Sequence, residues 1–260
     1  MNKQTNDFFI GWKGNTTVAH KKWLRKILVP IFIGIPILVF AIVFFTKPFS
    51  SGTFELGNVK EFTGVYYEEP FPVLLLDDNQ LKNGSSTSAL LVGFGKNGAK
   101  TFIHKAEEKL GKLSGQKIKI QGTLIYGDGK TLIELTKKED SVLEVLAPEV
   151  KKDFTPRFTK RVLWGEIIDP KCWFGVMKPA EGKVHKSCAI RCISGGIPPV
   201  LNVKSNSLNI YYILKGLNGE DINEQILEFV GEKIKIEGQS YMQNGWNVLR
   251  VNLKDINYAE

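Results

Sequence analysis

The sequence predicts a mainly β protein in which one N-terminal transmembrane helix is followed by two copies of a strand-rich unit. An uncharged apolar run, residues 27–45, is long enough to span a bilayer. An internal repeat relates residues 113–135 to residues 229–251 and predicts paired strands in both copies. All three cysteines lie in residues 169–199, in a stretch that only the second copy contains. The run and the repeat define the fold class, and the cysteine-containing stretch is where we expect a site.

Positive charge is concentrated at the N-terminus of the chain. The formal net charge is +8, but residues 1–26 carry six basic residues against one acidic residue and so account for +5 of it. The other 234 residues therefore hold only +3. A nucleic-acid-binding face needs clustered Lys and Arg. We therefore expect no nucleic-acid partner for the main part of the chain.

Residues 27–46 are expected to form the transmembrane helix. The apolar run has nineteen residues and, at 1.5 Å per residue, a length of about 28 Å, close to the hydrocarbon thickness of a bilayer. Pro30 and Pro36 within it are tolerated in a membrane span. A cleaved signal peptide is the alternative. Its apolar region has about 7–15 residues and ends in a small-residue cleavage site, a pattern that this run does not match, so an uncleaved anchor is the prediction.

Basic residues set the expected orientation of this helix. Lys21, Lys22, Arg25 and Lys26 precede the apolar run, and Lys47 alone follows it. Because positive flanks stay on the cytoplasmic side, residues 1–26 are expected to form a basic cytoplasmic tail. The helix would then anchor the protein in the inner (cytoplasmic) membrane, with its C-terminal domains in the periplasm or an equivalent extracytoplasmic space.

The repeat is the strongest structural signal in the chain. Residues 113–135 align without gaps on residues 229–251, and both copies contain the pattern G-x-K-I-K-I-x-G. Each copy reads as two alternating strands around a two-residue turn of the type that joins β-hairpins. The two turns are Asp128-Gly129 and Asn244-Gly245. Three shorter strands and a helical stretch precede each hairpin, and the helical stretches are residues 100–113 and 221–230.

The resulting order of strand, strand, strand, helix, strand, strand resembles the OB-fold, a five-stranded Greek-key barrel. The resemblance covers residues 57–138 as domain 1 and residues 160–257 as domain 2. It implies two tandem OB-like five-stranded barrels, each with one helix between strands 3 and 4. Residues 139–159, with prolines and mixed charges, are expected to form an exposed linker.

The two copies differ in the spacing between their first two strands. Eight residues separate Gly64 from Pro72, whereas thirty-four separate Gly165 from Pro199, and the extra residues form an insertion, 170–196. In the OB-fold the loop after strand one contacts ligands, so the resemblance implies a binding role for this insertion. The binding-loop candidates are Asp169, Trp173 and Met177. The segment GEIIDPKC…HKSCAIRCISGGIPP is also similar to one found in bacterial membrane-anchored proteins of unknown function, and that similarity implies no activity.

Four side chains of the insertion are metal-ligand candidates. His185, Cys188 and Cys192 stand at i, i+3 and i+7 of a short predicted helix and share one face, and Cys172 lies thirteen residues before His185. Three thiolates and an imidazole suit zinc, and soft ligands of this kind also suit copper. An extracytoplasmic compartment favours a disulfide instead, from Cys172 to Cys188 or Cys192, which would leave one cysteine beside His185. Both interpretations stay open at this point.

A glycine-rich stretch, residues 93–98, matches G-x-G-x-x-G after a predicted strand and before a predicted helix. No βαβ unit surrounds it, so we interpret it as a tight strand-to-helix turn rather than a dinucleotide loop. No nucleophile, base and acid can be grouped from the sequence, and no enzymatic activity is predicted.

Three hypotheses for function follow. The first is a single-pass accessory protein, acting with a protein partner as a subunit or assembly factor of a membrane complex such as a respiratory one. The second is a periplasmic redox or metal-handling protein that uses the Cys/His insertion. The third is an OB-type binder of nucleic acid or oligosaccharide.

Overall fold

The computed structural model describes residues 17–46, 52–77, 87–136, 140–147, 154–205 and 208–259. They belong to two compact units, Met1–Pro48 and Phe49–Glu260. The predicted tail is described from residue 17 onward, and its residues 1–16 lie outside the described residues.

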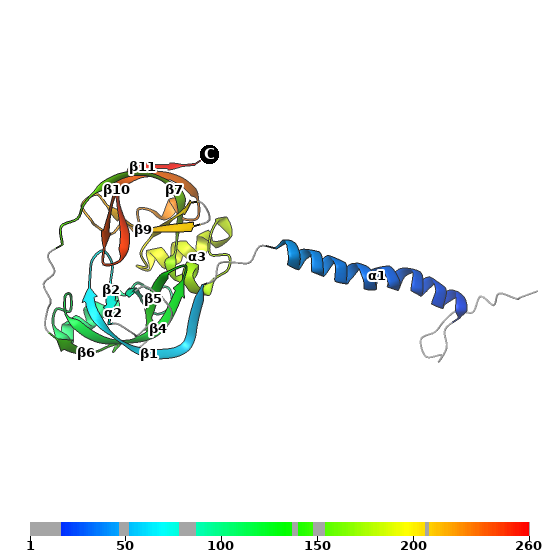
Figure 1. The fold of residues 1–260 in the computed structure, drawn as a ribbon, viewed down its shortest axis with the longest axis horizontal. Helices are drawn as coiled ribbons and strands as arrows, with labels where there is room; N and C mark the ends of the chain where they lie inside the picture. Colours follow the sequence, from blue (N-terminus) through cyan, green and yellow to red (C-terminus); the bar gives the residue numbers. More distant parts are fainter. Residues whose placement is uncertain are drawn as a thin grey trace, which may run out of the picture. The chain divides into compact units, whose positions relative to one another are not determined.

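The first unit contains a single described helix, α1 (Val18–Phe45), which is labelled in Figure 1. The Thr17 side chain caps its first turn by accepting a hydrogen bond from the backbone N–H of His20, at 3.3 Å. No residue of α1 is buried, and the helix is long and apolar enough to cross a membrane. It is longer than the predicted span of 27–46 because the basic residues before the apolar run are also helical.

The first barrel contains five strands. They are β1 (Thr53–Tyr67), β2 (Val73–Leu76), β3 (Ser88–Val92), β4 (Lys117–Gly127) and β5 (Lys130–Leu135). Their order is β1-β2-β3-β5-β4, and the pairing of β1 with β4 closes the barrel. Helix α2 (Lys100–Leu110) connects β3 to β4 and ends at Gly111, whose φ of 80° favours glycine.

The second barrel repeats this arrangement. Its strands are β7 (Thr159–Ile168), β8 (Val200–Ser205), β9 (Leu208–Gly216), β10 (Lys233–Gln243) and β11 (Trp246–Tyr258). They close in the order β10-β11-β9-β8-β7. In each barrel the third and fifth strands are parallel, β3 with β5 and β9 with β11. The predicted fold class, an apolar N-terminal helix and two five-stranded barrels, is confirmed.

The repeat places equivalent residues at equivalent positions. Gly122 of β4 pairs with Leu135 of β5, and Gly238 of β10 pairs with Val251 of β11. Both hairpin turns have positive φ at both central residues, as a type I′ turn requires. Asp128 and Asn244 hold the first of these positions, where their side chains tolerate the left-handed conformation.

One strand lies inside the stretch that the sequence analysis expects to be a linker. Strand β6 (Val142–Ala147) pairs with the first half of β4, so the sheet of the first barrel extends beyond residue 138. In the second barrel the same edge is paired by the end of β11, where Ile256 lies opposite Ile236 of β10. The long strand β11 of the second copy thus corresponds to the two short strands β5 and β6 of the first. Alignment of the hairpins alone misses β6.

The helix expected over residues 221–230 is reduced to turns and one 3-10 turn, η2 (Leu227–Phe229). Helix α3 (Lys183–Ser194) of the insertion packs against η2 in its place. Its Ala189 and Ile193 join Ile222 and Phe229 in the core of the second barrel. A longer helix is therefore unnecessary at that end, because α3 already covers the apolar opening.

Among the described residues, three hydrophobic clusters make up the core. One belongs to the first barrel and one to the second, but the third contains buried residues of both barrels together with the insertion. This third cluster, called the shared core below, includes Phe71, Val73 and Leu132 of the first barrel and Ile213 and Trp246 of the second. The barrels are therefore joined by a common hydrophobic interior.

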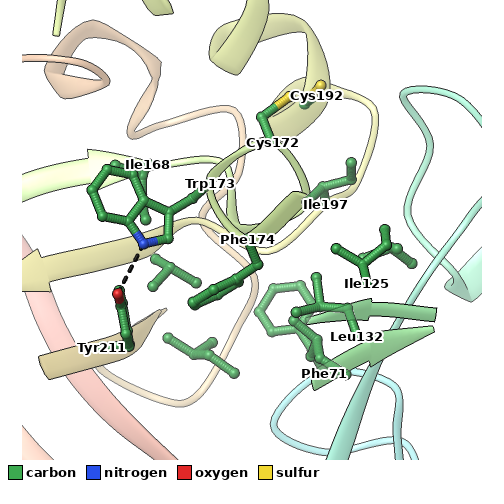
Figure 2. Close-up of a cluster of buried hydrophobic side chains, with 14 of the residues drawn as sticks. Phe71, Ile125, Leu132, Ile168, Cys172, Trp173, Phe174, Cys192, Ile197 and Tyr211 are labelled. Carbon is green, nitrogen blue, oxygen red and sulfur yellow. Dashed lines mark hydrogen bonds between the residues drawn. The ribbon is translucent and has the colours of Figure 1, made fainter. Parts of the chain in front are cut away.

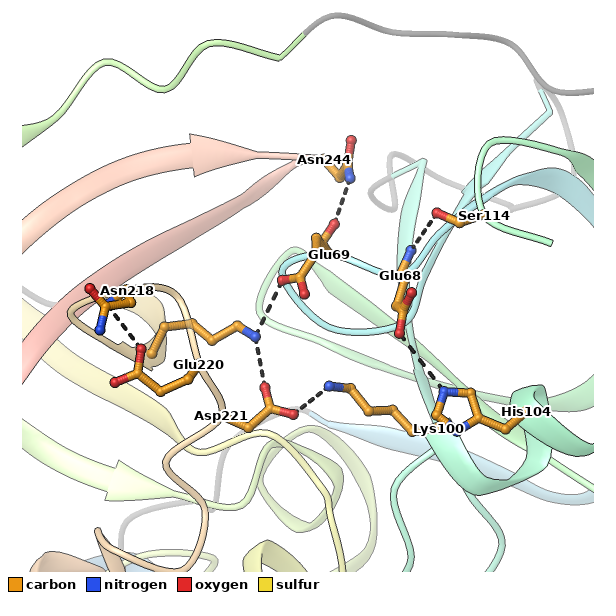
Figure 3. Close-up of polar contacts among 10 residues, drawn as sticks. Glu68, Glu69, Lys100, His104, Ser114, Asn218, Glu220, Asp221 and Asn244 are labelled. Carbon is orange, nitrogen blue, oxygen red and sulfur yellow. Dashed lines mark hydrogen bonds and ion pairs between the residues drawn. The ribbon is translucent and has the colours of Figure 1, made fainter. Parts of the chain in front are cut away.

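Charged side chains join the barrels at a second place, shown in Figure 3. Lys215 of β9 is 1% exposed and forms ion pairs with Glu69 of the first barrel, at 3.3 Å, and with Asp221, at 2.7 Å. Asp221 also pairs with Lys100, the first residue of α2. The Lys215 ammonium lies 4.6 Å from the centre of the Phe71 ring, which contributes a cation–π contact.

Candidate metal centre

The insertion begins where β7 ends and immediately turns into the interior. Asp169 is fully buried, and its Oδ1 accepts a hydrogen bond from the backbone N–H of Lys171, at 2.8 Å. A short π-helix, η1 (Cys172–Val176), follows, and α3 carries the remaining histidine and cysteines. Figure 2 shows Cys172 and Cys192 side by side within the shared core.

Two overlapping groups of metal-ligand side chains result. Cys172, His185 and Cys188 have ligand atoms that all lie within 4.8 Å of one another, and so do Asp169, Cys172 and Cys192. Sulfur atoms bound to one tetrahedral zinc ion lie about 3.8 Å apart, since each Zn–S bond is about 2.3 Å. Each group therefore needs only small shifts to bind an ion, and Cys172 belongs to both.

His185 has the features of a metal ligand. It is 3% exposed, and its Nε2 atom is buried without a hydrogen-bond partner among the described residues. Burial lowers the pKa of His185 below its usual value, although the Asp169 carboxylate partly opposes this and Lys96 adds to it. The imidazole is consequently neutral at pH 7, which is the form that binds metals.

The thiols lie in contrasting surroundings. The pKa of Cys172 is raised far above its usual value by hydrogen bonding with Cys192, by burial and by the Asp169 carboxylate. Cys188 is half-buried, and the ammonium group of Lys96 lies 3.6 Å from its sulfur. Cys188 is therefore the more accessible sulfur of its group, and Cys172 would have to lose its proton to bind a metal ion.

The four predicted ligands thus fall into two groups that share Cys172, with His185 and Cys188 in one and Cys192 in the other. The disulfide expected from Cys172 to Cys188 or Cys192 is not formed, because all three cysteines are free thiols. The donor set fits a soft metal ion held by two sulfurs and one imidazole, which is the number of protein ligands that leaves one coordination position open on zinc.

The predicted binding-loop residues do not form an exposed loop. Asp169 is buried beside the thiols, and Trp173 is 6% exposed and donates a hydrogen bond from Nε1 to the Tyr211 hydroxyl, at 2.8 Å. Figure 2 shows this bond at the edge of the shared core. Met177, at 41% exposed, is the one member of the three that reaches the surface. Asp169 and Trp173 therefore belong to the interior between the barrels, and Met177 lies on an exposed part of the insertion.

A buried lysine, which the sequence analysis does not identify, holds the insertion to the first barrel. Lys171 is 4% exposed, and its ammonium group donates to the carbonyl oxygens of Gly93 and Gly95, at 2.9 and 2.5 Å, and to the Glu134 carboxylate. The G-x-G-x-x-G stretch of the first copy therefore receives an ammonium group of the second copy, and no phosphate is needed to explain it.

The glycines of both copies are required for this contact. The backbone N–H of Gly98 donates to the carbonyl oxygen of Gly195, at 2.8 Å. A Cβ atom on Gly98 would lie 2.1 Å from the carbonyl oxygen of Gly196, and one on Gly195 would lie 1.9 Å from that of Lys96. The only sequence signal for this interface is that each copy has a glycine-rich stretch outside the aligned strands.

In comparisons with known proteins, no family model and no curated protein matches the chain.

Proposed function

We propose that the chain is a membrane-anchored, extracytoplasmic metal-binding protein that holds one soft metal ion, Zn²⁺ or Cu⁺, with Cys172, His185 and Cys188. The observation that carries this proposal is the burial of His185, whose Nε2 atom has no hydrogen-bond partner among the described residues and whose imidazole offers a nitrogen within 4.8 Å of two sulfurs. An unpaired buried polar atom destabilises a fold by about 1–3 kcal/mol. A bound ion would remove that penalty.

The second group of donors supports a role in metal handling rather than a purely structural ion. Asp169 and Cys192 lie beside Cys172, so an ion on the first group has further ligands within reach. Shared use of one sulfur allows an ion to move between the two groups by exchange of single ligands. A structural zinc site, by contrast, uses four fixed ligands at once.

Metal binding is tested with the full chain in detergent, reduced and freed of metal. We expect one Zn²⁺ or one Cu⁺ per chain, and separate titrations with each ion identify which binds more tightly. At a free-ion concentration 100 times the Kd, binding stabilises the fold by about 2.7 kcal/mol. His185→Ala, Cys172→Ser and Cys188→Ser each lose the ion. His104→Ala is the matched control, because that histidine is largely exposed on α2.

Two outcomes contradict the proposal. The first is that the wild-type chain binds neither ion at one equivalent. The second is that His185→Ala binds as tightly as the wild type. A thiol count separates the disulfide alternative, since a bridge between Cys172 and Cys192 under oxidising conditions would leave one titratable thiol instead of three.

The compartment is part of the proposal and has its own test. The basic residues before the apolar run of α1 favour a cytoplasmic N-terminus. An alkaline phosphatase fused after residue 260, which is active only outside the cytoplasm, is expected to be active. Activity of a cytoplasmic reporter alone at the same position would reverse the orientation.

The accessory role in a membrane complex stays a prediction. The insertion is buried on its cysteine side but exposes Met177 and Val184, so a protein partner could contact these residues or another surface. Pull-down of the tagged chain from solubilised membranes tests this role, and recovery of the chain without a stoichiometric partner would argue against it.

A further inference from the structure

The outer wall of the second barrel carries a pocket that the metal centre does not use. It has a volume of about 260 Å³ and lies where β7, β8 and β10 run side by side. Its lining includes Trp164, Glu166, Asn202, Lys204 and Lys233. We propose that this pocket binds one sugar ring of an oligosaccharide, a function separate from the proposed metal binding.

Strand register explains why these side chains share one face. Glu166 of β7 lies opposite Asn202 of β8 on one side and opposite Lys233 of β10 on the other. Trp164, two residues earlier on β7, points to the same side because side chains alternate along a strand. Leu163, next to Trp164, packs against the core of the barrel. The polar side chains of Asn202, Glu166 and Lys233 therefore form a row across the sheet, and the Trp164 ring lies beside this row.

Trp164 is exposed without an evident structural reason. It is 58% exposed, and its ring has the Lys235 ammonium 5.7 Å from its centre. A large aromatic ring on a closed sheet gains nothing from contact with water. Its flat apolar face matches the C–H face of a sugar ring, and the neighbouring polar row matches the hydroxyl groups at the ring edge.

Asn202 is the observation that points to a ligand. The residue is 2% exposed, yet its Oδ1 atom is buried with no hydrogen-bond partner among the described residues. Buried side-chain amides are almost always paired in folded proteins. Glu166 beside it uses one carboxylate oxygen to accept a hydrogen bond from the backbone N–H of Gly182. The other carboxylate oxygen of Glu166 and the Asn202 Oδ1 atom can accept hydrogen bonds from the hydroxyl groups of a sugar. The Asn202 amide nitrogen can donate one to them.

Other ligand classes fit this surface less well. A phosphate backbone would meet the Glu166 carboxylate at the centre of the pocket, which opposes nucleic acid. A peptide strand would need an open sheet edge, but β7 is paired on both sides, by β8 and by β10. The volume is below the roughly 300–1,000 Å³ of pockets that take drug-sized ligands. It suits one ring of a chain whose other rings extend over the surface.

The test uses the full chain in a detergent without a sugar headgroup, because an alkyl glycoside would compete. Four soluble probes are titrated by calorimetry and by tryptophan fluorescence: chitotetraose, cellotetraose, maltotetraose and a single-stranded oligonucleotide. We expect at least one oligosaccharide to bind. Trp164→Ala should weaken that binding by tenfold or more. Met242→Ala, a change at an exposed residue of β10 outside the pocket lining, should leave it within twofold.

Glu166→Gln provides a second variant that preserves the shape of the pocket and is expected to weaken binding three- to tenfold. A chelator should leave the affinity unchanged, which separates this site from the metal centre. Binding of none of the three oligosaccharides would overturn the proposal. So would binding that survives Trp164→Ala within threefold, or binding of the oligonucleotide in preference to all three sugars.

Discussion

Replacement of Lys171 by Met tests how firmly the insertion is held to the first barrel. The substitution keeps an unbranched side chain of similar length and removes only the ammonium group. That group makes three hydrogen bonds, two to backbone carbonyls and one to the Glu134 carboxylate, and the two charged side chains are 5% and 8% exposed. Lys171→Met therefore leaves a carboxylate buried without its counter-ion.

The expected loss is large. Removal of one partner of a buried ion pair destabilises proteins by about 3–5 kcal/mol. With a urea m-value of about 2 kcal/mol per M, the unfolding midpoint should fall by roughly 1.5–2.5 M. The double variant Lys171→Met/Glu134→Leu should recover much of this loss, because the isolated charge is then gone and apolar replacements of buried pairs are often tolerated.

The assay is urea unfolding of the full chain in detergent, followed by the fluorescence of the buried Trp173 and Trp246. Lys109→Met is the control, since Lys109 pairs with Asp140 at side chains 64% and 76% exposed. Exposed pairs contribute about 0–1 kcal/mol, so this variant should unfold near the wild-type midpoint. A loss below about 1 kcal/mol for Lys171→Met, or equal losses in both variants, would refute the reasoning.

Three further predictions concern the same unit. Gly98→Ala should lower the Tm by several degrees, because its Cβ would lie 2.1 Å from the Gly196 carbonyl oxygen, and an unchanged Tm would show that the loops separate freely. Burial lowers the pKa of His185, so the metal-free chain should lose stability as pH falls below about 6.5, and His185→Ala should flatten this dependence in unfolding measured from pH 5 to 8. Burial raises the pKa of Glu166, so its carboxylate destabilises the fold once ionised; Glu166→Gln should raise the Tm at pH 7 and change it little at pH 4, and the opposite order would contradict the burial account.

The two barrels could be predicted from the sequence because the repeat preserves residues with strict backbone roles. A Cβ atom on Gly122 or Gly238 would lie 2.5 or 2.4 Å from an atom of the paired strand, and the hairpin turns need positive φ. These backbone requirements explain why glycine occurs at the same strand and turn positions in both copies. Strand β6 could not be predicted by aligning the two copies. It pairs with β4 in the first copy, whereas the end of β11 pairs with β10 in the second.

The grouping of His185, Cys188 and Cys192 on one helix face was also predictable, since helical periodicity fixes it. The location of that face was not. Whether an insertion covers the surface or enters the interior depends on contacts with residues about 75 positions earlier, such as Lys171 with Gly93 and Gly95. No local pattern records such partners. Lysine side chains are usually exposed, so the sequence alone favours an exposed Lys171. Its ion pair with Glu134 allows the side chain to be buried.

The shared core has a consequence for how the chain is made. Nascent chains fold from the N-terminus at about 5–20 residues per second. Pro199, just after the insertion, lies sixty-four residues after Leu135, the end of β5. The first barrel therefore emerges roughly 3–13 s before the segment that covers its apolar side. During that interval Phe71, Val73 and Leu132 lack the residues that the insertion and the second barrel add to the shared core, and only first-barrel residues such as Leu90 are present beside them. A chaperone that shields this side until the insertion emerges would keep neighbouring nascent chains from associating through it.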